Sequence, residues 1–208
     1  MNAAVPGPTI ASEDIAADPH FRHLSTIAGI AVDLRYATPN NFVGRDLYSP
    51  YDCAWLHVDA AAALERVVAW LKARRPDVVP LVLDAVRPQR VQQELWDALE
   101  GTALRMYLAD PRRGSIHSFG MALDITLLDA AGRELDMGTG FDDMTELSHP
   151  ALEEGFLAAG KLSEEQVANR RLLRAAMLQA GFHGINSEWW HFDCGDRDLV
   201  RHTFRRVL

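Results

Sequence analysis

The spacing of hydrophobic residues predicts four strands. Residues 26–36 alternate between apolar and polar side chains, as a half-buried strand does. Residues 78–85 form a continuous apolar run of strand length, which is typical of a buried strand, and residues 121–128 form a second such run. Residues 187–192 are rich in aromatic side chains and predict the fourth strand.

Three segments have the spacing of amphipathic helices. Residues 57–74 place apolar side chains at intervals of three and four, so that they share one helical face. A second helix is predicted to begin at Pro88, because proline is favoured in the first helical turn. Residues 163–180 predict a third helix, with Ser163 and Gln166 in a capping-box pattern and Gly181 at its end.

The remaining segments are predicted to be irregular. Residues 1–24 contain many Ala, Pro and polar residues and predict a loosely packed arm before a domain of residues 25–208. Residues 37–55, 109–119 and 129–147 predict loops. Helices and strands follow one another without steady alternation. The pattern therefore predicts an α+β fold, a single domain whose mostly antiparallel central sheet is flanked by helices.

Composition narrows the classes of function. The chain has 208 residues, 48% of them hydrophobic, and a formal net charge of −8. A negative chain does not fit a general nucleic-acid binder and suits a protein that handles small molecules. No apolar run approaches the roughly 18 residues of a membrane span. The N-terminus lacks the pattern of a secretory signal, so we expect a cytoplasmic location, or a periplasmic one if a leader has been removed.

A histidine and an aspartate seven residues apart form the first candidate pair of metal ligands. His117 falls in a predicted loop and Asp124 in the strand that follows, with Gly120 between them to allow a tight turn. Imidazole nitrogen and carboxylate oxygen are zinc ligands. An aspartate flanked by Leu123 and Ile125 is also costly to bury unless it is paired or binds a metal. The alternative is a solvent-facing acid on a half-exposed strand.

Glu188 and His191 form the second candidate. His191 offers a third metal ligand, and Glu188 offers the general base that zinc peptidases require. Residues three apart on a regular strand point to opposite faces, so the chain must bend here, or one residue must sit at the strand end. In the alternative interpretation, Trp189 and Trp190 belong to the core and Glu188 is a surface charge.

The other histidines and the cysteines are weaker candidates for metal ligands. His183 is the nearest competitor of His191, but it lies in a glycine-flanked segment predicted to be a turn. Cys194 follows His191 by three residues and is interpreted as a small, partly buried side chain rather than a ligand. Cys53 and Cys194 could form at most one disulfide, which is too few for a fold held together by disulfides. The sequence alone leaves open whether they pair.

Five segments, in order, resemble the D-alanyl-D-alanine dipeptidase (VanX-type) family of zinc metallopeptidases, within the Hedgehog/D,D-peptidase fold. They are residues 33–44 (DLRYATPNNFVG), 84–88 (DAVRP), 115–124 (SIHSFGMALD), 137–142 (MGTGFD) and 188–191 (EWWH). The resemblance covers roughly residues 26–195, and several motifs in the family's order are more specific than any one alone. Val86 departs from the pattern, where the family usually has Tyr.

The resemblance implies a role for each matching residue. His117, Asp124 and His191 would bind one zinc ion per chain. Glu188 would act as general base toward a metal-activated water, and Arg87 would stabilise the charge that develops on the tetrahedral intermediate.

The resemblance also implies a substrate. Asp142 and Ser115 would hold the free ammonium group and nearby backbone of D-alanyl-D-alanine, and Tyr36 would close the pocket. Val86, beside Arg87, could alter the pocket's shape.

Two other functions remain as alternatives. One is a D,D-carboxypeptidase or L,D-peptidase of the same fold, acting on peptidoglycan fragments. The other is a zinc-holding binding module without catalysis, since one fold hosts many functions. A homodimer is also possible. The resemblance is compatible with vancomycin resistance, cell-wall recycling and use of D-alanine as a nutrient.

Overall fold

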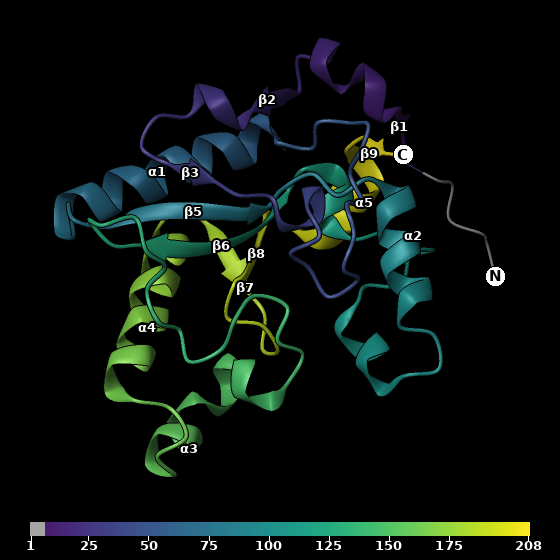
Figure 1. Ribbon diagram of the computed structural model, residues 1–208. Coiled ribbons are helices and arrows are strands. Elements are labelled where there is room, and N and C mark those ends of the chain that lie inside the picture. Colours follow the sequence, from purple (N-terminus) through teal and green to yellow (C-terminus); the bar gives the residue numbers. More distant parts are fainter. Residues whose placement is uncertain (1–6) are drawn as a thin grey trace.

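The computed structural model describes residues 7–208 and is built around a five-stranded sheet in the order β3-β5-β6-β8-β7 (Figure 1). The strands are β3 (Ala31–Val32), β5 (Val79–Asp84), β6 (Ala122–Leu128), β8 (His191–Cys194) and β7 (Phe182–Gly184). Strands β3 and β5 are parallel, and the other three pairings are antiparallel. The prediction of an α+β fold with a mostly antiparallel sheet is confirmed, and the sheet is mixed.

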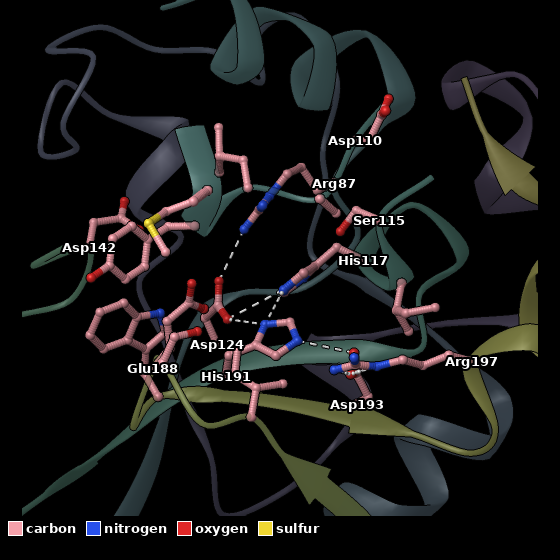
Figure 2. A pocket seen from close by; sticks show the side chains of 18 of the residues that line it. Arg87, Asp110, Ser115, His117, Asp124, Asp142, Glu188, His191, Asp193 and Arg197 are labelled. Atoms are coloured by element: carbon pink, nitrogen blue, oxygen red, sulfur yellow. Dashed lines mark hydrogen bonds and ion pairs between the residues drawn. The ribbon is translucent and has the colours of Figure 1, made fainter. Parts of the chain in front are cut away.

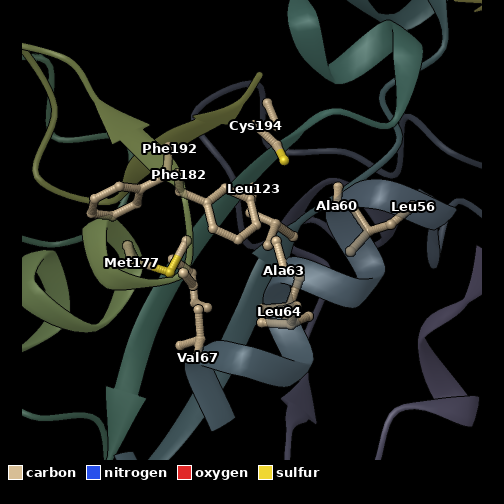
Figure 3. Close-up of a cluster of buried hydrophobic side chains, with 14 of the residues drawn as sticks. Leu56, Ala60, Ala63, Leu64, Val67, Leu123, Met177, Phe182, Phe192 and Cys194 are labelled. Atoms are coloured by element: carbon tan, nitrogen blue, oxygen red, sulfur yellow. The ribbon is translucent and has the colours of Figure 1, made fainter. Parts of the chain in front are cut away.

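Helices α1 (Val58–Arg74) and α4 (Glu164–Gln179) contact each other and pack on one face of this sheet. Figure 3 shows Leu64 and Val67 of α1 and Met177 of α4 gathered against Leu123 and Phe192 of the sheet. Both helices match their predicted ranges closely. The capping box predicted for α4 is present, because Ser163 accepts from the N–H of Gln166 and Gln166 accepts from the N–H of Ser163.

Strand alternation places polar side chains on the opposite face. In β6, Leu123 and Ile125 belong to the core beneath the helices, so Asp124 points the other way. Asp124 is paired in register with His191, and Leu123 with Phe192. Asp124 and His191 are therefore neighbours on the face that α1 and α4 leave free.

The second predicted helix, α2 (Gln89–Ala98), follows β5, and Pro88 is its N-cap. Shorter elements complete the fold: β1 (Thr9–Ile10), β2 (Phe21–His23), β4 (Trp55–His57), α3 (Glu153–Ala158), α5 (Arg197–Thr203) and β9 (Arg206–Val207). Within residues 7–208, no helix is both long enough and apolar enough to span a bilayer.

Two predicted strands need correction. The only strand within residues 26–36 is the two-residue β3, and the ends of the segment belong to 3-10 turns over Leu24–Thr26 and Arg35–Ala37. Ile27, Ile30 and Leu34 pack against the core from irregular backbone, while Val32, in β3, is exposed, so the apolar spacing did not reflect a strand. The strand predicted over 187–192 begins only at His191, and β8 runs on to Cys194.

The N-terminal segment is better ordered than a loose arm. Residues 1–6 lie outside the described part of the chain. Strand β1 pairs with β9 and β2 pairs with β4. Ile15 and Phe21 are buried in a small cluster with Val207. Residues 9–23 thus pack on the rest of the protein, while the division at residues 24 and 25 stays a prediction.

Candidate active site

A tight turn delivers His117 to the polar face of the sheet. The 3-10 turn Ile116–Phe119 ends at Gly120, whose φ of +66° is left-handed. A Cβ atom at this position would lie 2.7 Å from the backbone nitrogen of His57, so only glycine fits without displacement. After this turn the chain enters β6, and Nε2 of His117 lies 3.3 Å from Oδ1 of Asp124.

His191 completes a three-residue cluster. It is the first residue of β8 and is paired across the sheet with Asp124. Its Nδ1 atom lies 3.0 Å from Oδ1 of Asp124 and 3.1 Å from Nε2 of His117 (Figure 2). Among residues 7–208, this is the group of histidines, cysteines and carboxylates whose ligand atoms converge closely enough to hold a metal ion.

The outer nitrogen of each imidazole already has an acceptor. Nδ1 of His117 lies 2.8 Å from the carbonyl oxygen of Ala85, and Nε2 of His191 lies 3.0 Å from Oδ1 of Asp193. A ring N–H on each outer nitrogen leaves the inner nitrogens as lone-pair donors that face each other. Two lone pairs and a carboxylate oxygen around one point fit a divalent cation, and the nitrogen and oxygen donor set suits zinc.

The same carboxylates perturb the pKa of His191. Burial would lower this pKa, but the nearby carboxylates of Asp193 and Asp124 outweigh burial and raise it well above its ordinary value. A positive charge is therefore favoured at the centre of the cluster, whether a proton or a metal ion carries it.

Arg87 is held against the cluster by two carboxylates. Its Nε donates to Oδ2 of Asp84 at 2.8 Å, and its Nη2 donates to Oδ2 of Asp124 at 3.1 Å. Asp84 ends β5 opposite Asp124, next to a register shift in the strand pairing, and also accepts from the hydroxyl of Tyr48. Arg87 is thereby rigidly placed at the pocket wall.

Val86 does not reach the pocket. Its side chain is buried with Ile15, Phe21 and Val207 in a separate cluster. At the position where the family motif has Tyr, this chain therefore has a side chain that packs behind Arg87 and is not part of the pocket lining.

Glu188 lies in the irregular segment that precedes β8, which supplies the bend that its proximity to His191 requires. It lines the same pocket as His191 and is partly buried. Burial, reinforced by the charge of Asp124, raises the pKa of Glu188 to about 7 although His191 and Arg87 oppose the shift. A carboxylate with a pKa near neutrality is suited to accept and return a proton.

Asp142 occupies the same side of the pocket as Glu188 (Figure 2). It has a left-handed φ of +59°, and its Oδ2 accepts from the hydroxyl of Tyr36 at 2.8 Å. Burial raises the pKa of Asp142 well above its ordinary value, and the charges of Asp124 and Glu188 add to this effect. A cationic group bound here would reverse that shift.

All the residues predicted for the site line one cavity of about 460 Å³. They are Tyr36, Arg87, Ser115, His117, Asp124, Asp142, Glu188 and His191. Two weaker candidates lie elsewhere: His183 is exposed on β7, and Cys194 points into the core (Figure 3). Cys53 and Cys194 are both buried and unpaired with each other.

Several residues that support the site were not predicted from the sequence. Asp193 follows His191 by two positions, which on a strand places both side chains on one face. That spacing could have identified Asp193 as the hydrogen-bond partner of His191. Nothing in the local pattern signals the hydrogen bond between Tyr107 and His149 at the pocket rim, because these residues are 42 positions apart.

The chain matches a family of peptidases over most of its length. A sequence model of the family described as D-ala-D-ala dipeptidase matches residues 17–207. The D-alanyl-D-alanine dipeptidase of Escherichia coli (strain K12) is 40% identical over 164 residues, which are 79% of this chain and 78% of that protein. A protein of the same name from Enterococcus faecium is 29% identical over 202 residues, 86% of this chain and 92% of the relative.

A third relative, the D-alanyl-D-alanine dipeptidase of Synechocystis, is 35% identical over 147 residues, 56% of this chain and 60% of that protein. Together with the pocket, these matches define the chain as a peptidase. It belongs to the D-ala-D-ala dipeptidase family.

Proposed function

We propose that this peptidase hydrolyses free D-alanyl-D-alanine to two molecules of D-alanine and depends on zinc. The observation that carries the proposal is the arrangement of the imidazoles. The inner nitrogens of His117 and His191 lie 3.1 Å apart beside a carboxylate oxygen of Asp124, and each outer nitrogen has its own acceptor. These three residues would hold one zinc ion per chain.

A bound zinc ion supplies Lewis acidity and lowers the pKa of a water molecule at the site. Glu188 acts as the general base. Burial raises its pKa, to about 7 before a cation binds, so the carboxylate is suited to take a proton from the attacking water and later to give it to the leaving amine. Glu188 lines the same pocket as the three proposed zinc ligands, which places its carboxylate on the side from which water would attack.

Arg87 stabilises the negative charge that develops on the scissile carbonyl oxygen. Its guanidinium is fixed by Asp84 and Asp124 before substrate arrives, so no reorganisation is needed when negative charge appears. The contact of its guanidinium with the ring of Tyr36, 4.9 Å to the ring centre, further restricts its orientation.

Asp142 recognises the free ammonium group of the substrate. Among residues 7–208 it has no arginine or lysine partner, and its hydrogen bond from Tyr36 fixes one oxygen and leaves the other for a donor. Ser115 is buried at the start of the turn that carries His117 and lines the pocket, where it would contact the backbone of the substrate. The names of the relatives from Escherichia coli and Enterococcus faecium support D-alanyl-D-alanine as the substrate.

The test compares free D-alanyl-D-alanine with its N-acetyl derivative, using the zinc-loaded protein. We expect rapid release of D-alanine from the free dipeptide and little from the acetylated one, because acetylation removes the ammonium group. Equal cleavage of both would favour the carboxypeptidase alternative. No cleavage of either, at full zinc occupancy, would favour the binding module.

Two variants separate metal binding from catalysis. Glu188→Gln should abolish turnover and still bind one equivalent of zinc, as measured by elemental analysis. His117→Ala should lose the zinc. Full zinc occupancy in His117→Ala would refute the ligand assignment, and turnover at the parent rate in Glu188→Gln would refute the base assignment.

A further inference from the structure

We infer that the pocket binds the substrate's free C-terminal carboxylate through an arginine cluster, defined as Arg113, Arg197 and Arg201, at the end opposite Asp142. The inference rests on the proposed function and adds to it the orientation of the peptide and a requirement for a free C-terminus. All three arginines line the same cavity as His117 and His191.

The fold brings the arginine cluster to this end from two segments. Arg197 and Arg201 are four residues apart on α5, which places their side chains on one side of the helix. Arg113 precedes Ser115 in the segment that leads to His117. Nε of Arg201 donates to the carbonyl oxygen of Gly114 at 3.1 Å, which ties α5 to that segment.

The arginine cluster carries more positive charge than its neighbours neutralise. Arg197 is committed to Asp193, to which its Nε donates at 2.6 Å. Arg113 and Arg201 share one carboxylate, that of Asp198, at 3.4 Å and 3.3 Å. The side chain of Asp198 is 73% exposed, so water screens both ion pairs strongly.

Arg201 is the member best placed to receive a ligand. Its side chain is only 12% exposed, and within residues 7–208 its Nη2 has no hydrogen-bond acceptor. Burial lowers the pKa of Arg201, and the positive charge of Arg113 lowers it further. Asp110 also lines this end of the pocket, but its carboxylate is engaged by Arg112 at 2.6 Å.

The two ends of the pocket therefore differ in charge. Asp142 and Glu188 lie on one side of His191, and Arg197 lies on the other (Figure 2). Neither Asp142 nor Glu188 forms an ion pair with an arginine or lysine in the described chain. A free dipeptide is a zwitterion whose two charges flank a single peptide bond. With its ammonium group at Asp142 and its carboxylate at Arg201, that bond lies over the His117, Asp124 and His191 cluster.

The experiment compares D-alanyl-D-alanine with its C-terminal amide in the parent and in Arg201→Gln. We expect the parent to prefer the acid, and Arg201→Gln to raise KM for the acid by about 10- to 100-fold, the effect of losing one charge-assisted hydrogen bond. KM for the amide should change little, so the variant loses the preference. Arg133→Gln is the matched control, because Arg133 is 79% exposed, pairs with Asp129 and is outside the cavity.

The outcomes separate the inference from the proposed function. An unchanged preference for the acid in Arg201→Gln would overturn the carboxylate site while leaving the dipeptidase proposal intact. Failure of the zinc-loaded parent to cleave either compound would overturn both. If Arg201→Gln does not fold, as judged by circular dichroism and zinc content, Arg113→Gln is measured instead, and retention of the parent's preference there would overturn the inference.

Discussion

Nη2 of Arg87 lies 3.1 Å from Oδ2 of Asp124, while Oδ1 of the same carboxylate faces His117 and His191. The two oxygens of Asp124 therefore have different partners: Oδ2 accepts from Arg87, and Oδ1 faces the imidazoles. The carboxylate cannot rotate Oδ1 away from the imidazoles without breaking the contact between Oδ2 and Arg87. A single buried arginine thus couples the wall of the pocket to the candidate metal ligands.

This coupling predicts that Arg87→Lys is not a conservative change. Lysine keeps the charge but lacks the fork that reaches Asp84 and Asp124 together. We expect kcat for D-alanyl-D-alanine to fall by about 100-fold or more, with zinc still bound. Steady-state kinetics and zinc analysis provide the measurement, with Arg133→Lys, which is exposed, as control. A kcat within a factor of two of the parent would rule out the role of Arg87.

Gly120→Ala should destabilise the protein and misplace His117. The left-handed φ costs a residue with a Cβ roughly 1–2 kcal/mol, and crowding against the backbone of His57 adds about 1–3 kcal/mol. Gly132→Ala is the matched control, because its φ is +75° and no atom lies within 4 Å of the added Cβ. Urea denaturation should show a clearly larger loss for Gly120→Ala. Equal losses would mean that the close approach to His57 contributes nothing.

The sequence predicted the centre of this site better than its surroundings. Asp124 could be recognised because a carboxylate in an apolar strand is anomalous, and Gly120 because a loop must turn to bring His117 back to that strand. By contrast, the strand predicted over 26–36 was mostly wrong, since Ile27, Ile30 and Leu34 reach the core from irregular backbone and Val32 is exposed. The arginine cluster combines α5 with the distant segment at Arg113, and no local pattern encodes that contact.

The loop that carries Asp142 depends on Thr139. Its Oγ1 accepts from Nε1 of the buried Trp189 at 2.8 Å and lies 2.9 Å from the hydroxyl of Ser148. Thr139→Val leaves the indole N–H without an acceptor, which costs about 1–3 kcal/mol. We expect lower stability in urea and a raised KM for the free dipeptide, because Asp142 is less firmly placed. Thr145→Val, exposed in the same loop, is the control. Parent KM and stability in Thr139→Val would contradict this account.

Glu188 should make both activity and stability depend on pH. The base must be ionised, so kcat/KM rises with pH through the pKa of Glu188, which is about 7 without a metal ion and lower beside a bound cation. The acidic limb of the zinc-loaded enzyme is therefore expected at or below about pH 7. A limb centred well above pH 7 would exclude Glu188 as its origin.

The stability effect has the opposite sign. Folding raises the pKa of Glu188 from 4.5 to about 7, so the folded state holds the proton more tightly than the unfolded state. This contribution is fully present below pH 4.5 and is lost as the pH rises through about 7. The metal-free parent should thus lose stability relative to Glu188→Gln over that window. Parallel stability curves for the two proteins would contradict the raised pKa.

Asp193 should control how tightly the metal is held. It is buried, and although burial would raise its pKa, His191 and Arg197 lower the pKa of Asp193 to about 2. It therefore stays ionised and holds the Nε2 proton of His191, which keeps Nδ1 free to bind a cation. Asp193→Asn weakens the hydrogen bond to Nε2 of His191. We therefore expect zinc affinity, measured in competition with a chelator, to fall by about 10- to 100-fold. Asp77→Asn, an exposed acid paired with Arg75, should keep the parent affinity. If Asp193→Asn also keeps it, the orientation of His191 is set by the strand alone.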